Sequence, residues 1–329
     1  MTDASFIQVK NLVKYYPVYS TGVLTKKQVG KVHAVDDITF DIRKQETFAL
    51  VGESGCGKTT TARLMLNLIE PTSGQVIVDG ENVIEKFKSA DRKERLKIRR
   101  KMQMIFQNPY GSLDPRMTIS DIIAEPLVIH GHVDKKCHSE RVYELLKLVG
   151  LEEYHAERYP HEFSGGQRQR ICIARALAVE PEFIVADEPV SSLDVSIRAQ
   201  ILNLLAELQK TMGLSFLYIS HDLSSVRQIS QRVAVMYLGE IVELADTDEL
   251  FDNSLHPYTQ ALIDAVPIPD PKAKNINARL KGEVPSPINP PIGCRFNPRC
   301  PKATKECTET KPALLEARKN HLVACYHNG

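Results

Sequence analysis

A glycine-rich segment, Gly52-Glu-Ser-Gly-Cys-Gly-Lys58-Thr59, limits the possible folds more than any other part of the chain, because it fits the pattern G-x-x-x-x-G-K-[ST]. Glycines let backbone N–H groups curl around phosphate oxygens, and a helix beginning at Lys58 points its positive dipole end at the same anion. The Lys58 ammonium reaches the β- and γ-phosphates, and the Thr59 hydroxyl can ligate Mg²⁺. A strand predicted at Thr47–Val51 precedes the loop, and a helix predicted from Lys58 to about Glu70 follows it. The segment therefore predicts a nucleotide-binding site. Its expected nucleotide-binding residues are Gly52, Glu53, Ser54, Gly55, Cys56, Gly57, Lys58, Thr59 and Thr60.

Two acidic residues follow a second apolar run, Phe183–Ala186. Open α/β sheets bind ligands at the carboxyl ends of their strands, which is where Asp187 and Glu188 are expected. Asp187 would hold Mg²⁺, and Glu188 would polarise a water molecule for attack on the γ-phosphate. An Asp-Glu pair after a strand usually marks only the start of a loop. Beside a phosphate loop, however, it predicts the second half of a hydrolytic site.

Composition is that of a soluble globular protein of roughly two domains. Of 329 residues, 43% are apolar and 25% charged, and 42 Lys and Arg against 41 Asp and Glu leave a net charge of +1. This balance produces no global field toward nucleic acid, and no nucleic-acid partner is expected. No apolar run approaches the roughly 18 residues of a spanning helix, and residues 1–5 lack the apolar core of a secretory signal. We expect a cytosolic chain that works at a membrane only as a peripheral subunit.

Short apolar runs alternate with helical segments along the chain. Further strands are predicted at Gln75–Asp79, Phe216–Ile219 and Val233–Met236. Buried strands separated by helices favour an α/β fold with a largely parallel sheet covered on both faces. Residues from about 112 to 180 have helical periodicity and are interpreted as a helical subdomain inserted into the sheet domain. Beyond Val266 the composition becomes that of a proline-rich linker, so we expect a nucleotide-binding domain at 1–268 and a C-terminal extension at 269–329.

The segment Phe163-Ser-Gly-Gly-Gln-Arg168 predicts a helix capped by a serine with exposed backbone amides. Together with the two phosphate-site elements, it resembles the signature sequence of ATP-binding-cassette ATPases. That family has a RecA-like P-loop ATPase core with a mostly parallel sheet, a small antiparallel β portion and a helical subdomain. The resemblance implies that Lys58, Glu188 and His221 are catalytic and that Thr59, Gln107 and Asp187 hold Mg²⁺. Its remaining motifs are the adenine-stacking Tyr16 (with Tyr15 as a neighbouring candidate), the Q-loop Gln107, the signature residues Ser164, Gly165, Gly166 and Gln167, the D-loop Asp194 and the switch residue His221.

Longer segments narrow the resemblance to the ATPases of oligopeptide/dipeptide importers, and Tyr110-Gly111 is similar to their F-type subunit. These segments are 107–115, 158–161, 256–259, 282–287 and 293–300. The resemblance implies ATP hydrolysis that powers peptide import, with ATP sandwiched between two cassettes. It also implies a second, D-type ATPase subunit, two transmembrane permeases and an extracytoplasmic peptide-binding protein. The chain would then lie peripherally on the cytoplasmic face of the cell membrane.

Four of the seven cysteines, Cys294, Cys300, Cys307 and Cys325, lie within the last 36 residues. In a cytosolic chain such clustering indicates a metal or cluster site before disulfides. Structural zinc sites usually have tighter C-x₂₋₄-C pairs, and four thiolates can equally hold an iron–sulfur cluster. The family resemblance implies a 4Fe–4S cluster, while zinc and unligated thiols or disulfides stay open.

Three other functions are compatible with parts of the pattern. Related importers carry nickel or other small solutes, and the sequence does not name the substrate. A soluble cassette ATPase of DNA repair or translation would usually carry a long coiled coil or two cassettes, and neither is visible. A non-hydrolysing regulatory subunit is disfavoured by the intact Lys58, Glu188 and His221.

Overall fold

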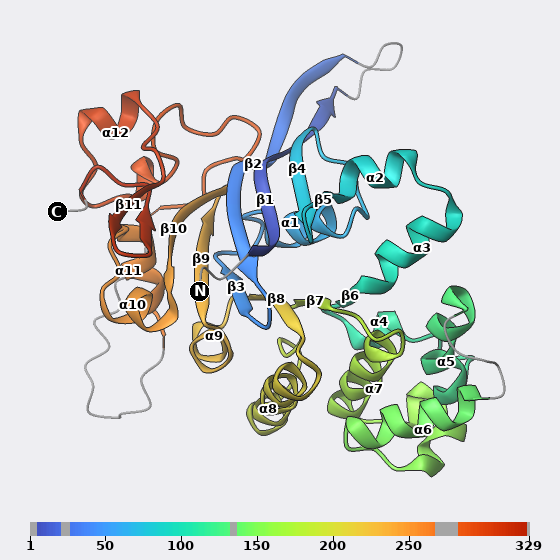
Figure 1. Ribbon diagram of the computed structural model, residues 1–329. Coiled ribbons are helices and arrows are strands. Elements are labelled where there is room, and N and C mark those ends of the chain that lie inside the picture. The colour runs from blue at the N-terminus through green and yellow to red at the C-terminus, as the bar shows by residue number, and fades with distance from the viewer. Residues whose placement is uncertain (1–4, 21–26, 132–136, 267–281, 328–329) are drawn as a thin grey trace, which may run out of the picture. The chain divides into compact units, whose positions relative to one another are not determined.

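The structure, a computed structural model, describes residues 5–20, 27–131, 137–266 and 282–327. The chain divides into two compact units. Figure 1 labels the helices and strands of both. The first comprises residues 1–6, 42–47 and 81–220, and the second comprises residues 7–41, 48–80 and 221–329. Across the described residues, none of the helices combines the length and apolarity that a bilayer crossing requires. The expected domain boundary at 268/269 lies outside the described residues.

The first unit combines three parallel strands with most of the helices. Strand β7 (Phe183–Asp187) pairs on one side with β6 (Met102–Ile105) and on the other with β8 (Ser215–Ser220). Its elements are β5 (Glu81–Asn82), α2 (Val83–Ser89), α3 (Arg92–Lys101), β6 (Met102–Ile105), α4 (Pro109–Ser112), α5 (Ile119–His130), α6 (His138–Leu148), the short 3₁₀ turns Glu153–Glu157 and Pro160–Glu162, α7 (Gly165–Leu177), β7 (Phe183–Asp187), α8 (Val195–Met212) and β8 (Ser215–Ser220).

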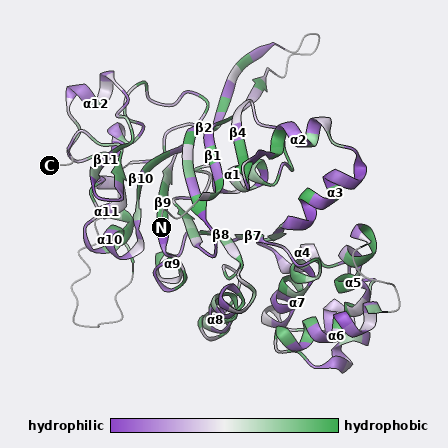
Figure 2. Ribbon diagram, in the orientation of Figure 1, coloured by the Kyte–Doolittle hydropathy of each residue, from purple (hydrophilic) through white to green (hydrophobic). Residues whose placement is uncertain are grey.

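Apolar burial explains why these segments take their places. Every residue of β7 and β8 is buried, as expected of strands that are covered on both faces. Helices α5, α6 and α7 bury apolar residues at helical spacing, among them Ile123, Leu145 and Ile173, each of which contributes roughly 1.5–3 kcal/mol. In contrast, none of the residues of α3 is buried, and Figure 2 shows that helix as hydrophilic along most of its length.

The second unit contains the strands around the glycine-rich loop. Strand β3 (Thr47–Val51) pairs in parallel with β9 (Arg232–Tyr237), and β9 pairs antiparallel with β10 (Glu240–Asp246). Strand β1 pairs antiparallel with β4 in a separate sheet. The elements are β1 (Ser5–Tyr19) and β2 (Gln28–Arg43), which lie mostly in this unit, then β3 (Thr47–Val51), α1 (Lys58–Met65), β4 (Ser73–Val78), α9 (Leu223–Ile229), β9 (Arg232–Tyr237), β10 (Glu240–Asp246), α10 (Thr247–Asp252), α11 (Pro257–Asp264), the 3₁₀ turn Asn297–Arg299, α12 (Lys305–Glu309), β11 (Leu315–Arg318) and β12 (His321–Val323).

The predicted strands are confirmed to within a residue or two, but the helix after the glycine-rich loop is shorter than predicted. Helix α1 ends at Met65 rather than near Glu70. Asn67 adopts a left-handed conformation with φ of 48°, and the Leu68 amide donates to the Arg63 carbonyl oxygen at 2.8 Å. This pattern satisfies the last helical carbonyls and terminates the helix.

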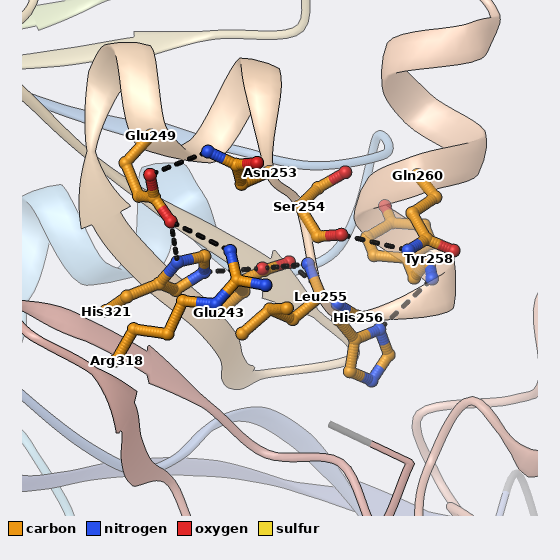
Figure 3. Close-up of polar contacts among 10 residues, drawn as sticks. All are labelled: Glu243, Glu249, Asn253, Ser254, Leu255, His256, Tyr258, Gln260, Arg318 and His321. Carbon is orange, nitrogen blue, oxygen red and sulfur yellow. Dashed lines mark hydrogen bonds and ion pairs between the residues drawn. The ribbon is translucent and has the colours of Figure 1, made fainter. Parts of the chain in front are cut away.

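The C-terminal extension continues the sheet of the second unit. Strand β12 pairs antiparallel with β10, with Val323 opposite Glu243, and β11 pairs with β12. His321 is fully buried and lies between two carboxylates (Figure 3). Its Nε2 is 2.8 Å from Glu243 Oε1, and its Nδ1 is 3.2 Å from Glu249 Oε1. The Glu243 carboxylate also accepts hydrogen bonds from the amides of Leu255 and His256, at 2.6 and 3.1 Å. One buried carboxylate therefore ties β10, β12 and the start of α11 together.

The His321 contacts predict a pH-dependent contribution to stability. Burial lowers the pKa of His321, but hydrogen bonds to Glu243 and Glu249 outweigh it and raise the pKa above its usual 6.5. Because the folded-state pKa exceeds the unfolded one, this stabilisation is complete below about pH 6.5 and is lost as pH rises through the folded-state value. His321→Gln should lower the free energy of unfolding by about 3 kcal/mol near pH 6.5 and by less at pH 8.5. Denaturant titrations at both pH values measure this difference. His161→Gln, at an exposed position, is the control. A loss of unfolding free energy in His321→Gln that does not depend on pH would contradict the prediction that His321 is ionised in the folded protein.

Candidate phosphate-binding site

The glycine-rich loop joins the buried strand β3 to helix α1, as its pattern predicts. Gly52 and Gly57 have φ values of 147° and 113°, which L-residues with side chains rarely adopt. A Cβ at Gly52 would lie 2.1 Å from the Met236 carbonyl oxygen, and one at Gly57 would lie 2.2 Å from that of Ala34. Both glycines are therefore required by close backbone approach as well as by their φ values. Gly57 supplies no side-chain cap to α1, and the N-terminus of a helix is a favourable place for a bound anion.

The Lys58 side chain curls back into the loop. It is 5% exposed, and its Nζ donates to the carbonyl oxygens of Gly52 at 2.7 Å and Glu53 at 3.0 Å. The neighbouring Cys56 is 4% exposed, and burial raises the pKa of its thiol despite the nearby Lys58 charge. A buried, protonated thiol is a poor nucleophile, which fits a packing role for Cys56. Thr59 and Thr60 follow on the first turn of α1 and are half-buried.

The acidic pair lies where the sequence places it, at the end of β7. Asp187 is its last residue and is 3% exposed. Glu188 has a left-handed φ of 47°, and its amide donates to the Ile219 carbonyl oxygen at 2.9 Å. Gln107 Nε2 donates to Glu188 Oε2 at 2.8 Å, so the structure brings together these two predicted site residues. Positive φ at a residue other than glycine is costly and is typical of functional positions.

The predicted signature segment begins helix α7. Ser164 Oγ accepts from the Gln167 amide at 3.3 Å, and Gln167 Oε1 accepts from the Ser164 amide at 3.1 Å, which is a reciprocal capping box. A Cβ at Gly166 would lie 2.4 Å from Ile197 Cγ2, whereas Gly165 has only ordinary contacts. Gly166 thus permits α7 to pack against α8. Phe163 is 5% exposed, consistent with its expected packing role.

Two further predicted residues lie at element boundaries. Asp194 caps helix α8 by accepting from the Ile197 amide at 2.9 Å and from Ser196 Oγ at 2.8 Å. These two hydrogen bonds hold the pKa of Asp194 below its ordinary value. His221 is exposed and directly follows β8. The phosphate loop and His221 belong to the second unit, while Gln107, the acidic pair, the signature segment and Asp194 belong to the first.

The structure distinguishes the two aromatic candidates for adenine stacking. The Tyr15 hydroxyl donates to Asp36 Oδ1 at 2.5 Å, and its ring lies 4.3 Å from that of His33. Burial and the Asp36 hydrogen bond raise the pKa of Tyr15 to about 12. Tyr16 is 39% exposed, so its ring is accessible to a ligand while that of Tyr15 is engaged. Asp36 is also paired with Arg295, a residue of the C-terminal extension.

The four C-terminal cysteines line one cavity, together with His256, Phe296 and His327. All four are free thiols, and burial raises the pKa of Cys294 to about 11. Within the ranges that the structure describes, no set of three or more His, Cys, Asp or Glu side chains is arranged to hold a metal ion as it stands. The structure therefore brings the cysteines to one place without forming a complete ligand set.

Sequence reasoning did not assign a role to three residues that contact the predicted site, namely Tyr258, Arg299 and Tyr110. The Tyr258 hydroxyl accepts a hydrogen bond from the Glu53 amide at 2.9 Å, and the Arg299 guanidinium pairs with the Glu53 carboxylate. Arg168 lies over the Tyr110 ring at 4.2 Å and thus joins the signature helix to the segment after Gln107. Tyr110, Tyr258 and Arg299 all lie in segments that the sequence singled out, but only for their resemblance to a family. Their partners could not be found from spacing, because they lie far away along the chain.

These features define a P-loop nucleotide-binding protein, and comparisons with known proteins place it more narrowly. Residues 35–191 match the ABC transporter family, and residues 242–307 match the family described as oligopeptide/dipeptide transporter, C-terminal region. The chain is 50% identical to the oligopeptide transport ATP-binding protein AppF of Bacillus subtilis over 98% of this chain and 97% of the relative. It is 60% identical to OppF of the same organism, over 77% and 82% of the two chains.

A solved structure supports the same assignment. The ATP-binding cassette MJ0796, in a dimeric post-hydrolysis state bound to ADP and phosphate, matches with a TM-score of 0.63 at 30% identity, over 73% of this chain and 98% of that chain. The chain therefore belongs to the ATP-binding proteins of ABC transporters, in the oligopeptide/dipeptide transporter group. Its α/β cassette fold with mostly parallel strands confirms the fold class predicted from sequence.

The backbone collision at Gly57 predicts the effect of a single methyl group. Gly57→Ala should weaken binding of Mg-ATP more than tenfold, because the Cβ displaces the loop from Ala34. Gly55→Ala is the matched control: Gly55 also has a positive φ, of 79°, but nothing lies within 4 Å of its added Cβ. Equilibrium binding of a fluorescent ATP analogue to both full-length variants measures the difference. Equal losses of affinity in the two variants would show that the positive φ, and not the collision of the added Cβ with Ala34, weakens ATP binding.

Proposed function

We propose that the chain is the ATP-hydrolysing subunit that powers import of di- and oligopeptides through an ABC transporter. The observation that carries this proposal is the phosphate loop, in a chain that matches an oligopeptide transport ATP-binding protein over nearly its whole length. The match to the oligopeptide/dipeptide transporter C-terminal region supports peptides as the substrate class. Nickel or another small solute is the alternative cargo.

The side-chain types at the predicted positions suit metal-assisted phosphoryl transfer. The Thr59 hydroxyl, the Asp187 carboxylate and the Gln107 amide oxygen are oxygen donors of the kind that Mg²⁺ prefers. When bound, Mg²⁺ would neutralise charge on the β- and γ-phosphates. Lys58 would leave the loop carbonyls for the phosphate oxygens, and His221 would hydrogen-bond the γ-phosphate. Glu188 would accept a proton from the attacking water.

The contact between Gln107 and Glu188 suggests how the side chain of the base is oriented. Gln107 Nε2 occupies one carboxylate oxygen of Glu188, at 2.8 Å. A Gln107 that turns toward Mg²⁺ would release that oxygen for the water. Nucleotide binding and activation of the base would then be linked by one side chain.

The proposed assembly contains two cassettes and two transmembrane permeases. The capped N-terminus of α7, with Ser164, Gly165, Gly166 and Gln167, would meet the γ-phosphate held by the other cassette, and Asp194 would lie at the same interface. The second cassette is a D-type subunit, and an extracytoplasmic protein delivers the peptide. The chain would be peripheral, on the cytoplasmic face of the membrane. ATP can drive the permeases only by the difference in its affinity for closed and open cassettes.

We also propose that the cassette occupies about 1–268, with the helical subdomain at about 112–180, and that the extension at 269–329 holds a 4Fe–4S cluster. The shared cavity of the four cysteines supports this proposal, because thiolates are the usual ligands of such clusters. Ligand thiols must lose their protons on binding, so the raised pKa of Cys294 makes loading favour alkaline conditions. The cluster would have a structural role, with zinc as the alternative occupant.

The general base is tested by Glu188→Gln. This variant should retain Mg-ATP affinity but lose steady-state hydrolysis by at least about 100-fold, because the amide cannot accept the proton of the water. Glu182→Gln is the matched control, since that carboxylate precedes β7 and pairs with Lys101 on the surface. Phosphate release and nucleotide binding by the assembled transporter are the two measurements. Undiminished hydrolysis in Glu188→Gln would remove Glu188 from the reaction.

The cysteine proposal predicts a brown protein after anaerobic purification, with iron and acid-labile sulfide in equal amounts. Cys300→Ser should abolish the colour and the iron, whereas Cys137→Ser, at an exposed position remote in sequence from the extension, should keep both. Metal analysis and visible absorption make the measurement. Colourless protein that contains zinc would overturn the cluster.

A further inference from the structure

The C-terminal extension contacts the phosphate loop through one arginine. Arg299 Nη1 donates to Glu53 Oε2 at 2.7 Å, and Nη2 donates to Glu53 Oε1 at 3.0 Å. The Arg299 side chain is 5% exposed and that of Glu53 is 27% exposed. This is a bidentate, largely buried pair, the strongest form of the arginine–carboxylate interaction. The two partners are separated by 246 residues in sequence.

Glu53 is the second residue of the phosphate loop, and both its main chain and its side chain are held. Its amide donates to the Tyr258 hydroxyl at 2.9 Å, while its carboxylate is fixed by Arg299. Its carbonyl oxygen accepts from Lys58 Nζ at 3.0 Å and from the Cys56 amide at 3.3 Å. The residue whose carboxylate Arg299 holds is therefore also in direct contact, through its carbonyl oxygen, with the Lys58 ammonium.

The Arg299–Glu53 pair also affects the charge of the phosphate loop. A carboxylate within the phosphate loop repels the polyphosphate that the loop must bind, unless a cation neutralises it. The Glu53 hydrogen bonds raise the pKa of Arg299 further above its already high ordinary value, so the guanidinium stays charged. Arg299 thus supplies a counter-charge to the Glu53 carboxylate.

The fold of the extension fixes Arg299 for this contact. Arg299 ends a 3₁₀ turn that begins at Asn297, and its amide donates to the Phe296 carbonyl oxygen at 2.9 Å. Its guanidinium lies 5.8 Å from the centre of the Tyr237 ring and 6.0 Å from that of Phe296. Phe296 is itself 1% exposed, and Cys300 follows Arg299 directly. The position of the guanidinium therefore depends on the local packing of the cysteine-bearing segment.

We propose that Arg299 is a positioning residue for ATP: it neutralises and orients Glu53 and so makes the affinity of the phosphate loop depend on the folded C-terminal extension. This inference requires only that the loop binds ATP, and it does not depend on what the ATPase drives. Arg299 acts through Glu53 and takes no part in the chemistry. Its loss should therefore raise KM and leave kcat nearly unchanged.

Four variants of the full-length chain test the proposal: Arg299→Ala, Arg299→Lys, Glu53→Gln and the double variant Arg299→Ala/Glu53→Gln. Arg299→Ala should weaken Mg-ATP binding and raise KM about tenfold, the size expected for an uncompensated charge near the phosphates. Adding Glu53→Gln should restore most of that affinity, because the repelling charge is then gone. Arg299→Lys should fall between wild type and Arg299→Ala, since lysine keeps the charge but not the bidentate geometry.

The control and the double variant distinguish the proposed role of Arg299 from a purely structural one. Arg318→Ala is the control, because it removes another arginine–glutamate pair of the extension. Arg318 Nη1 donates to Glu249 Oε1 at 3.2 Å, and this pair does not touch the phosphate loop. The control variant should therefore leave KM unchanged. Melting temperatures are measured in parallel. Wild-type KM in Arg299→Ala would overturn the proposal, as would a double variant no better than Arg299→Ala. If Arg299→Ala does not fold, Arg299→Lys decides: a KM equal to that of wild type contradicts the proposal, and a raised KM with unchanged kcat supports it.

Discussion

The ammonium group of Lys58 lies inside a loop whose shape two glycines make possible, and the nucleotide site depends on that arrangement. The loop approaches the backbone at Met236 and Ala34 so closely that no Cβ fits at Gly52 or Gly57. It is also held by the Gly239 amide, which donates to the Cys56 carbonyl oxygen at 2.8 Å. The loop is therefore preorganised by its neighbours, with the Lys58 ammonium held inside it.

The C-terminal extension contributes to this preorganisation at two places. Arg299 holds the Glu53 side chain, and Arg295 holds Asp36, which in turn fixes Tyr15 beside the exposed Tyr16. His321, buried between Glu243 and Glu249, anchors the extension to the same sheet. Residues 282–327 of the extension, which carry the four cysteines, thus belong to the same compact unit as the phosphate loop. Buried ion pairs add little net stability, but they set geometry and leave a costly unpaired charge when one partner is lost.

Local patterns predicted the strands, the phosphate loop and the helix capped by Ser164, because periodicity and capping are properties of short segments. The end of α1 was predicted five residues too late, since the left-handed Asn67 is one of several conformations open to that sequence. The sequence already favoured Tyr16 over Tyr15, but the hydrogen bond between Tyr15 and Asp36, and the pairing of Arg299 with Glu53, depend on contacts between residues far apart in the chain. Such contacts follow from tertiary packing, which composition and spacing do not encode locally. Gly166 shows the same limit: its motif suggested phosphate access, whereas the structure adds a packing requirement against Ile197.

The central claim is that this ATPase drives peptide import as part of a membrane complex. Its most direct test is to purify the tagged chain from detergent-solubilised membranes, identify its partners, and measure ATP hydrolysis with and without peptide-loaded binding protein. The account predicts two permeases and a second cassette in the complex, with hydrolysis stimulated by peptide. A chain that purifies without permeases, or with DNA or ribosomes instead, would leave its membership of the cassette family intact and contradict the transport function.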